Sequence, residues 1–498
     1  MKGLVAVITV IAVLLSSALA QPLPQPMPPG PGGSCAHGWS RSGSFCVPRQ
    51  GAQDTIPLPP NCPFPNCTGA DLESVPIVNS DSSASITLFV PRTGIQPSEV
   101  AVIVNDQDSQ STTVGAYFQQ KHGIPAANVI HVSFSPGSAS HFSMDSTTFA
   151  ALKSQVDAQL SSDIQAYAIT WTFPYAVGAG MSITSAFAFG YDDTNAGGSN
   201  TAMVRPLPRT CNVLPQDPYF DSASVRPYTD YNIRPAMMIA GSTTRNATNV
   251  IDRGVLSAQI MPSGTGYFLD TSDVVRSNPR IADFKHTVMT WTHANGLTLN
   301  YLVEDYIQNM ANVLFYETGL TTVPKINTNH YLPGSVADHL TSGGGNLESG
   351  QQMDVLAWLE AGATASYGEV VEPCARAQKF PQASVLVSNY FSGNTVVEAY
   401  TKSVQMPGEG LFVGDPLARP FGTTASFSGG ALKIKTSIMQ PGSTYSLYGA
   451  ASAALSPVRL QNNLSLSQQG YLTITDRSGF YPYYELLKTG TNWNPLFR

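Results

Sequence analysis

Short apolar runs alternate with amphipathic stretches through the middle of the chain. Residues 100–105, VAVIVN, form an apolar run between polar residues, which predicts a buried strand. Residues 113–121 predict a helix that Gly123 and Pro125 terminate, and a second strand begins at Val129. A crossover helix joins parallel strands, so this order predicts a parallel pair.

The same alternation continues to about residue 420. The pattern predicts further strands at 165–173, 266–270, 363–371 and 410–414, and further helices at 149–160, 250–259, 297–317, 351–361 and 395–404. The segment 191–235 is rich in Pro, Asp, Asn and Tyr and predicts a long loop. We therefore predict a doubly wound α/β domain over residues 95–421, with a mostly parallel sheet flanked by helices.

After residue 421 the pattern changes to strand-like alternation between Gly and Pro turns. The alternating segments are 423–427, 431–438, 443–448, 458–466 and 471–475. This pattern predicts a small all-β module, a sandwich, over residues 422–498.

The first 20 residues have the features of a signal peptide. A basic start precedes the apolar run 4–15, and Ala18-x-Ala20 fits the small-residue rule for cleavage. No later stretch has the roughly 18 uninterrupted apolar residues that a membrane helix needs. We expect a secreted, extracellular protein with no membrane span.

The chain has six cysteines, and an even number of cysteines in an exported protein favours disulfides. A Pro-rich linker over 21–33 leads into a Cys-rich segment over 34–70, where two local bridges are expected. Outside that segment, Cys211 and Cys374 either pair with each other or stay as free thiols. The disulfide candidates are Cys35, Cys46, Cys62, Cys67, Cys211 and Cys374.

Composition narrows the classes of partner and cofactor. Charged residues are 12% of the chain, the formal net charge is -7, and no Lys/Arg cluster occurs, which disfavours nucleic acid. The chain has no P-loop, no dinucleotide fingerprint, no G-x-S-x-G and no H-E-x-x-H. We therefore predict no cofactor and no metal.

Two segments could carry chemistry at the C-terminal part of the α/β domain. ADHLTSGGG contains His339, and the stretch GATASYGEVVEPC ends at Cys374. Carboxyl ends of neighbouring parallel strands meet at one edge, where ligands bind. A thiolate activated by an imidazole can attack there, and N–H groups of a Gly-rich loop can hold an oxyanion. His339 and Cys374 are thus candidates for a catalytic dyad.

Each of these residues also has a purely structural interpretation. His339 fits a strand-end histidine held by hydrogen bonds, and Cys374 fits a disulfide to Cys211. The candidate binding residues fit helix capping, chain turns or an exposed loop carboxylate just as well. Those binding candidates are Thr341, Ser342, Gly343, Gly344 and Glu372.

Several motifs support a resemblance to known families. The segments ADHLTSGGG, WLEAGATASYGEVVEPC and GLFVGDPLARPF resemble an uncharacterised family of secreted, mostly bacterial proteins over about residues 98–421. More distantly, the chain resembles the gingipain-type cysteine peptidases, which implies a caspase-like fold. Those peptidases carry His-Gly, whereas Leu340 follows His339 here, and no Cys lies between His339 and GATASYG.

Two hypotheses follow. The first is a secreted cysteine-hydrolase-like protein, a peptidase by fold analogy that acts on a peptide or protein substrate, with a site that is either active or degenerate. The second is a non-catalytic extracellular binding or structural protein with a matrix partner on the same fold. The chain also has three N-glycosylation sequons, at Asn66, Asn246 and Asn463, which only a eukaryotic host would use.

Overall fold

The computed structural model describes residues 39–42, 45–48, 72–138, 140–192, 215–291, 296–347, 352–452 and 457–489. The chain divides into a unit that ends at Phe64 and a unit that begins at Pro65. In the first unit, β1 (Trp39–Ser42) and β2 (Phe45–Pro48) form an antiparallel pair. The predicted signal peptide, the Pro-rich linker, most of the Cys-rich segment and Cys211 lie outside the described residues.

The second unit contains a ten-stranded mixed sheet made of two halves. The first half-sheet contains β12 (Gly264–Leu269), β13 (Leu297–Leu302), β14 (Val313–Thr318), β15 (Tyr331–His339) and β16 (Ala365–Glu369). The second half-sheet contains β5 (Val100–Asn105), β6 (Val129–Val132), β8 (Ala166–Ile169), β11 (Ala236–Met238) and β17 (Gly410–Gly414). The strand order is β13-β12-β14-β15-β16-β17-β11-β8-β5-β6. Each half-sheet is parallel, and the halves meet at the antiparallel pair β16–β17.

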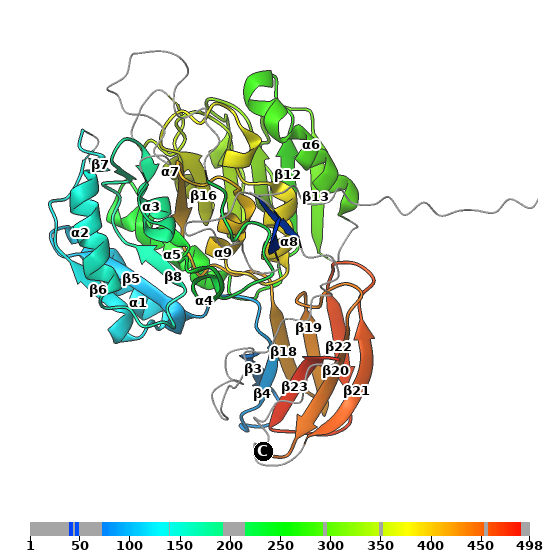
Figure 1. Ribbon diagram of the computed structural model, residues 1–498. Coiled ribbons are helices and arrows are strands. Elements are labelled where there is room, and N and C mark those ends of the chain that lie inside the picture. Colours follow the sequence, from blue (N-terminus) through cyan, green and yellow to red (C-terminus); the bar gives the residue numbers. More distant parts are fainter. Residues whose placement is uncertain are drawn as a thin grey trace, which may run out of the picture. The chain divides into compact units, whose positions relative to one another are not determined.

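Helices cover both faces of this sheet (Figure 1). One apolar layer involves α1 (Ser109–His122), α5 (Thr244–Leu256), α6 (Val274–Thr290), α8 (Ala383–Phe391) and α9 (Val396–Ser403). The other involves α2 (Ser146–Asp157), α3 (Ile183–Phe189) and α7 (Val355–Ala361). Shorter elements are α4 (Pro227–Tyr231) and a three-stranded sheet of β7 (Ser143–Met144), β9 (Ala176–Val177) and β10 (Met181–Ser182).

Strand β5 shows why its sequence is an unbroken apolar run. Val102 packs in the layer of α1, whereas Ile103 packs in the layer of α2. Successive strand residues point to opposite faces, so a strand with helices on both faces needs apolar residues at every position. The predicted strands at 100–105 and 410–414 are confirmed.

The predicted helix over 297–317 is wrong. The segment forms β13 and β14, with a left-handed residue at Asn309 in the connection. In β13, Leu297 and Leu299 are buried while Thr298 between them is exposed, which is strand periodicity. All residues of β14 are buried, as a central parallel strand requires. Helix α6, in a region where the sequence pattern predicts no element, begins at its N-cap Asp273 and contains Pro279.

The C-terminal strands form one eight-stranded sheet with two strands from before the α/β domain. The strands are β3 (Leu72–Asn79), β4 (Thr87–Pro91), β18 (Thr423–Ser428), β19 (Ala431–Thr436), β20 (Thr444–Ala450), β21 (Val458–Ser465), β22 (Leu472–Asp476) and β23 (Tyr483–Lys488). Their order is β21-β20-β23-β4-β3-β18-β19-β22. The predicted two-sheet sandwich is not confirmed, because the β3–β4 pair joins all strands into one ladder.

This β module encloses one apolar cluster, which includes Leu88, Leu432 and Leu486. The sheet curls until its two edge strands approach each other, and Gln461 Nε2 donates to the carbonyl of Thr475 at 2.7 Å. The module therefore has a core of its own. Its strands come from the chain before the α/β domain and from the chain after it.

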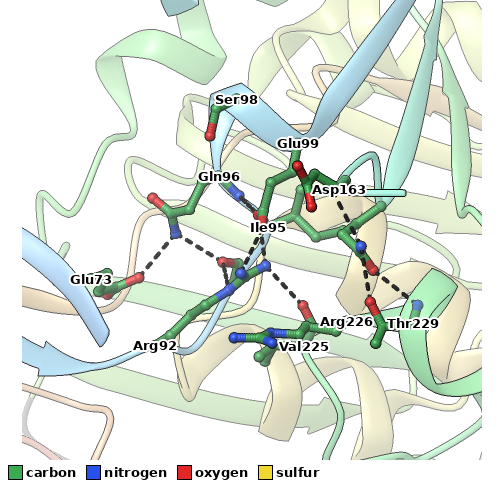
Figure 2. Close-up of polar contacts among 12 residues, drawn as sticks. Glu73, Arg92, Ile95, Gln96, Ser98, Glu99, Asp163, Val225, Arg226 and Thr229 are labelled. Atoms are coloured by element: carbon green, nitrogen blue, oxygen red, sulfur yellow. Dashed lines mark hydrogen bonds and ion pairs between the residues drawn. The ribbon is translucent and has the colours of Figure 1, made fainter. Parts of the chain in front are cut away.

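Buried and partly buried ion pairs tie the chain where it passes between the β module and the α/β domain. Arg419 donates to both carboxylate oxygens of Glu73 at 2.9 and 2.7 Å, and Gln96 donates to Glu73 at 3.1 Å. Arg92 donates to both oxygens of Glu99, each at 2.6 Å (Figure 2). Bidentate Arg–carboxylate pairs fix geometry, so the entry and exit segments are held together.

Candidate functional site

The two segments singled out in the sequence meet at the carboxyl edge of the first half-sheet. Strands β15 and β16 are adjacent and parallel, and they end at His339 and Glu369. The N–H of Gly345 donates to the carbonyl of Glu369 at 2.8 Å. A Cβ on Gly368 would lie 2.4 Å from the carbonyl carbon of Gly344, so the glycine loop and β16 touch backbone to backbone. This contact explains why glycines occupy both sides.

His339 lies beneath this loop, with both ring nitrogens occupied. Its side chain is buried, with 1% of the residue exposed. Nε2 lies 3.0 Å from the carbonyl of Met353, and Nδ1 lies 2.9 Å from Trp358 Nε1. A carbonyl only accepts and an indole N–H only donates, so Nε2 carries the proton and Nδ1 is the acceptor. Burial lowers the pKa of His339 to about 4, which keeps the ring neutral.

The residues after His339 are fixed by one carboxamide. Oε1 of Gln352 accepts from the hydroxyl of Thr341 and from the N–H of Gly343, both at 2.8 Å. Thr341 is fully buried and also accepts from Nε of Arg276 at 3.1 Å. Thr341 and the Gly343 amide thus hold the loop in place, and Gly345 does the same through Glu369.

A cavity of about 270 Å³ opens beside the loop at this edge. It combines an apolar wall with one guanidinium, one hydroxyl and one carboxylate. Its lining residues are Val275, Arg276, Leu340, Ser342, Glu372, Pro373, Cys374 and Ala375. Of the predicted binding residues, Ser342 and Glu372 line the cavity, whereas Thr341, Gly343 and Gly344 form the loop behind it.

Sequence analysis missed Arg276, the cation of this cavity. Arg276 lies in the first turn of α6, which follows the carboxyl end of β12. Its Nη1 donates to Asp273 at 2.8 Å while its Nε donates to Thr341. These two bonds fix the plane of the guanidinium. The only sequence signal for it was a possible N-cap, Asp273, after a buried strand.

Cys374 lines the cavity and is disulfide-bonded. Its partner is not among the residues whose side chains the structure describes. Cys374 and Ala375 both have left-handed backbones, with φ of 62° and 49°. The N–H of Cys374 donates to Glu372 Oε1 at 2.7 Å. Residues other than Gly seldom adopt this conformation, so the turn that presents Cys374 is constrained.

A buried ion cluster lies within the same half-sheet. Arg280 of α6 donates to Asp338 at 2.6 Å and to Glu317, and all three side chains are buried. Glu317 and Asp338 are register partners on β14 and β15. Burial raises the pKa of Glu317 well above its usual value, and Arg280 opposes that effect. Three ionisable side chains thus occupy a layer that apolar residues would ordinarily fill.

A second buried group lies where β16 meets β17. Lys379 Nζ donates to Glu409 at 2.6 Å, and Tyr367 donates to Glu369 at 2.8 Å. Burial raises the pKa of Glu409 to about 7, and the charge of Glu372 at the cavity adds to the rise. Burial also raises the pKa of Glu369 well above its usual value. Glu369 and Glu409 therefore keep their protons to a higher pH than exposed glutamates do.

Neither a metal site nor a membrane helix occurs in the ranges that the structure describes. No group of three or more His, Cys, Asp or Glu side chains is placed there to hold a metal ion. Of the helices in those ranges, none has the length and apolar character needed to cross a membrane.

Comparisons with known proteins give limited information. No protein-family model and no curated protein matches the chain. A solved structure titled "Structure of Protease" is 11% identical with a TM-score of 0.38, and it covers 80% of this chain and 99% of its own. The complex of Porphyromonas gingivalis RgpB pro- and mature domains is 9% identical with a TM-score of 0.31, covering 78% and 99%. At these scores neither likeness establishes an activity for this chain.

Proposed function

We propose that this chain is a non-catalytic extracellular binding protein on an α/β frame. The observation that carries the proposal is the environment of His339. Its proton is held by Met353 and its lone pair by Trp358, so the ring has no free nitrogen to activate a thiol. A thiol dyad also needs a thiolate, and Cys374 is disulfide-bonded.

The cavity at the carboxyl edge is the proposed binding site. Arg276 is held by Asp273 and Thr341, which leaves its remaining N–H groups in a fixed plane. A fixed guanidinium is suited to bidentate binding of a carboxylate. The neighbouring Leu340 and Pro373 suit an aliphatic body. We propose a carboxylate with a short aliphatic side chain as the ligand class, as found at the end of a peptide.

Binding can be tested with acetyl-Ala-Val carrying a free carboxylate and with the same peptide as an amide. Calorimetry on the full chain should show that the free acid binds at least tenfold more tightly than the amide. Arg276→Gln should remove that difference. Arg245→Gln removes the same charge from an exposed position on α5 and should leave binding unchanged. Equal binding of both peptides would contradict the proposed ligand class.

Catalysis can be tested with the same preparation by alkylating thiols before and after reduction. Cys374 should label only after reduction, and we propose Cys211 as its partner. The binding-protein proposal fails if the unreduced protein labels at Cys374 and hydrolyses a peptide library. That activity would have to disappear in both Cys374→Ser and His339→Asn, and the peptidase hypothesis would then replace ours.

A further inference from the structure

One sequon, at Asn463, lies on an exposed strand at one end of a sheet. Strand β21 is at one end of the eight-stranded sheet and pairs with β20. The residues of β21 are all partly or wholly exposed, and both Asn463 and Ser465 of the sequon are exposed. The carboxamide therefore projects from a strand with solvent beside it.

The backbone at Asn463 is also unusual. Between Tyr445 and Leu447 of β20, the register on β21 moves from Leu464 to Gln461, which leaves an extra residue on β21. Such a bulge bends a strand and re-aims its side chains. Asn463 has φ of 55°, a left-handed conformation that Asn tolerates better than most residues. The bulge thus turns Asn463 out of the regular ladder.

The sequon at Asn246 differs, because the carboxamide of Asn246 is held by hydrogen bonds. It lies in the first turn of α5, where its Nδ2 donates to Ser242 Oγ and to Glu360 Oε1, both at 2.9 Å. A sugar on Nδ2 would replace one of these protons and displace a partner oxygen. The folded chain therefore disfavours a modified Asn246.

We infer that Asn463 is an N-glycosylation site of this protein and that Asn246 is not. The donor is a lipid-linked oligosaccharide with a pyrophosphate leaving group. Nδ2 of Asn463 forms a bond to C1 of the first sugar and loses a proton, while the bond from C1 to the phosphate oxygen breaks and releases the lipid pyrophosphate. A glycan here would cover the exposed side of an end strand, and covered edges resist pairing with other chains.

The test is glycopeptide mass spectrometry of the full chain secreted from a eukaryotic host. Enzymatic deglycosylation in heavy-oxygen water should convert Asn463 to labelled Asp and leave Asn246 unchanged. Asn463→Gln should lower the mass of the secreted protein by one glycan. Asn246→Gln should leave the mass of the glycans unaltered, which makes it the matched control.

Three results would overturn the inference. They are a bare Asn463 in secreted protein, occupancy at Asn246, and failure of the chain to enter the secretory pathway. A Ser465→Ala variant separates the sequon from any effect of the Asn side chain on folding. It keeps Asn463 but should lose the same glycan, and retention of that glycan would also count against the assignment.

Discussion

The two half-sheets have the same strand-and-helix plan but very different interiors. In the second half-sheet, β8 and β11 have the sequences AYAI and AMM, and all their residues are buried. In the first half-sheet, neighbouring strands bury Glu317, Asp338 and Glu369. The cavity lies at the carboxyl edge of this charged half. The comparison indicates that the apolar half is framework and the charged half positions the loops of the site.

The buried charges are a poor source of stability. Removing two ions from water costs several kcal/mol each, and a buried pair recovers that cost only with good geometry. Arg280 has that geometry, because it contacts Glu317 and Asp338 on two neighbouring strands. It therefore links α6, which carries Arg276, to β14 and to β15, which ends at His339. We interpret this cluster as the contact that positions the start of α6 and the carboxyl ends of β14 and β15.

The largest effect should come from breaking this cluster. Arg280→Met leaves Glu317 and Asp338 buried without their cation, and we expect a loss of about 3–5 kcal/mol in the free energy of unfolding. Urea unfolding at pH 7 measures it. In the apolar half, Ile103→Val should cost only about 1 kcal/mol.

A triple variant separates charge from packing. Arg280→Met with Glu317→Gln and Asp338→Asn removes the guanidinium and both carboxyl groups, and it should recover most of the stability lost in Arg280→Met. If the triple variant is as unstable as the single one, packing rather than charge explains the loss, and the contrast between the halves is weaker than we argue.

The next effect concerns pH. The pKa of His339 is about 4 in the folded protein against 6.5 ordinarily, so the unfolded state takes up the proton first as pH falls. The contribution of neutral His339 to the free energy of unfolding is fully present above pH 6.5. It decreases as the pH falls toward 4, by up to about 3 kcal/mol. Unfolding free energies at pH 7 and 4.5 should show this loss in the wild type.

His339→Gln is the control for that measurement. Gln supplies one N–H and one oxygen in place of the two ring nitrogens, but it does not titrate. Other titrating groups, such as Glu409 beside Lys379, are common to both proteins, and their effects cancel in the difference. Parallel pH dependences in the two proteins would mean that His339 is not buried as a neutral ring.

The smallest effect should come from the glycine loop, and it offers a matched pair. A Cβ on Gly368 would meet the backbone of Gly344 at 2.4 Å, whereas a Cβ on Gly343 would meet nothing closer than Gln352 at 3.6 Å. Gly368→Ala should cost about 1–3 kcal/mol and weaken carboxylate binding. Gly343→Ala should change neither by a measurable amount. Similar behaviour of the two variants would refute the close contact between the loop and β16.

Much of the α/β framework could be predicted from local patterns. An unbroken apolar run such as VAVIVN identifies a strand with helices on both faces, and Gly and Pro identify the end of α1 near Gly123. The two segments that meet at the carboxyl edge were also singled out, because they contain a His beside a Gly run and a Cys, although strand β15 itself was not predicted. Periodicity and chain breakers are properties of neighbouring residues, so a sequence shows them directly.

Other features depend on contacts between residues far apart in the chain. Segment 297–317 has no Pro and enough apolar residues for a helix, but its two ends pair with β12 and form two strands. The contact of Arg276 with Thr341 spans 65 residues. The partners of His339 likewise arise from folding, because nothing in ADHLTSGGG indicates that Trp358 will occupy a ring nitrogen. Sequence alone therefore left its role open.

The topology of the β module has a consequence for how this chain can be made. Strands β3 and β4 occupy the middle of the ladder, between β23 and β18, yet they leave the ribosome before the whole α/β domain. The β3–β4 hairpin cannot take its place in the sheet until the last strands have been synthesised, because β4 pairs with β23 and β3 pairs with β18. A fragment that starts at residue 422 would lack its two central strands. The α/β domain is thus an insertion in a β domain that can close only after β23 has been synthesised.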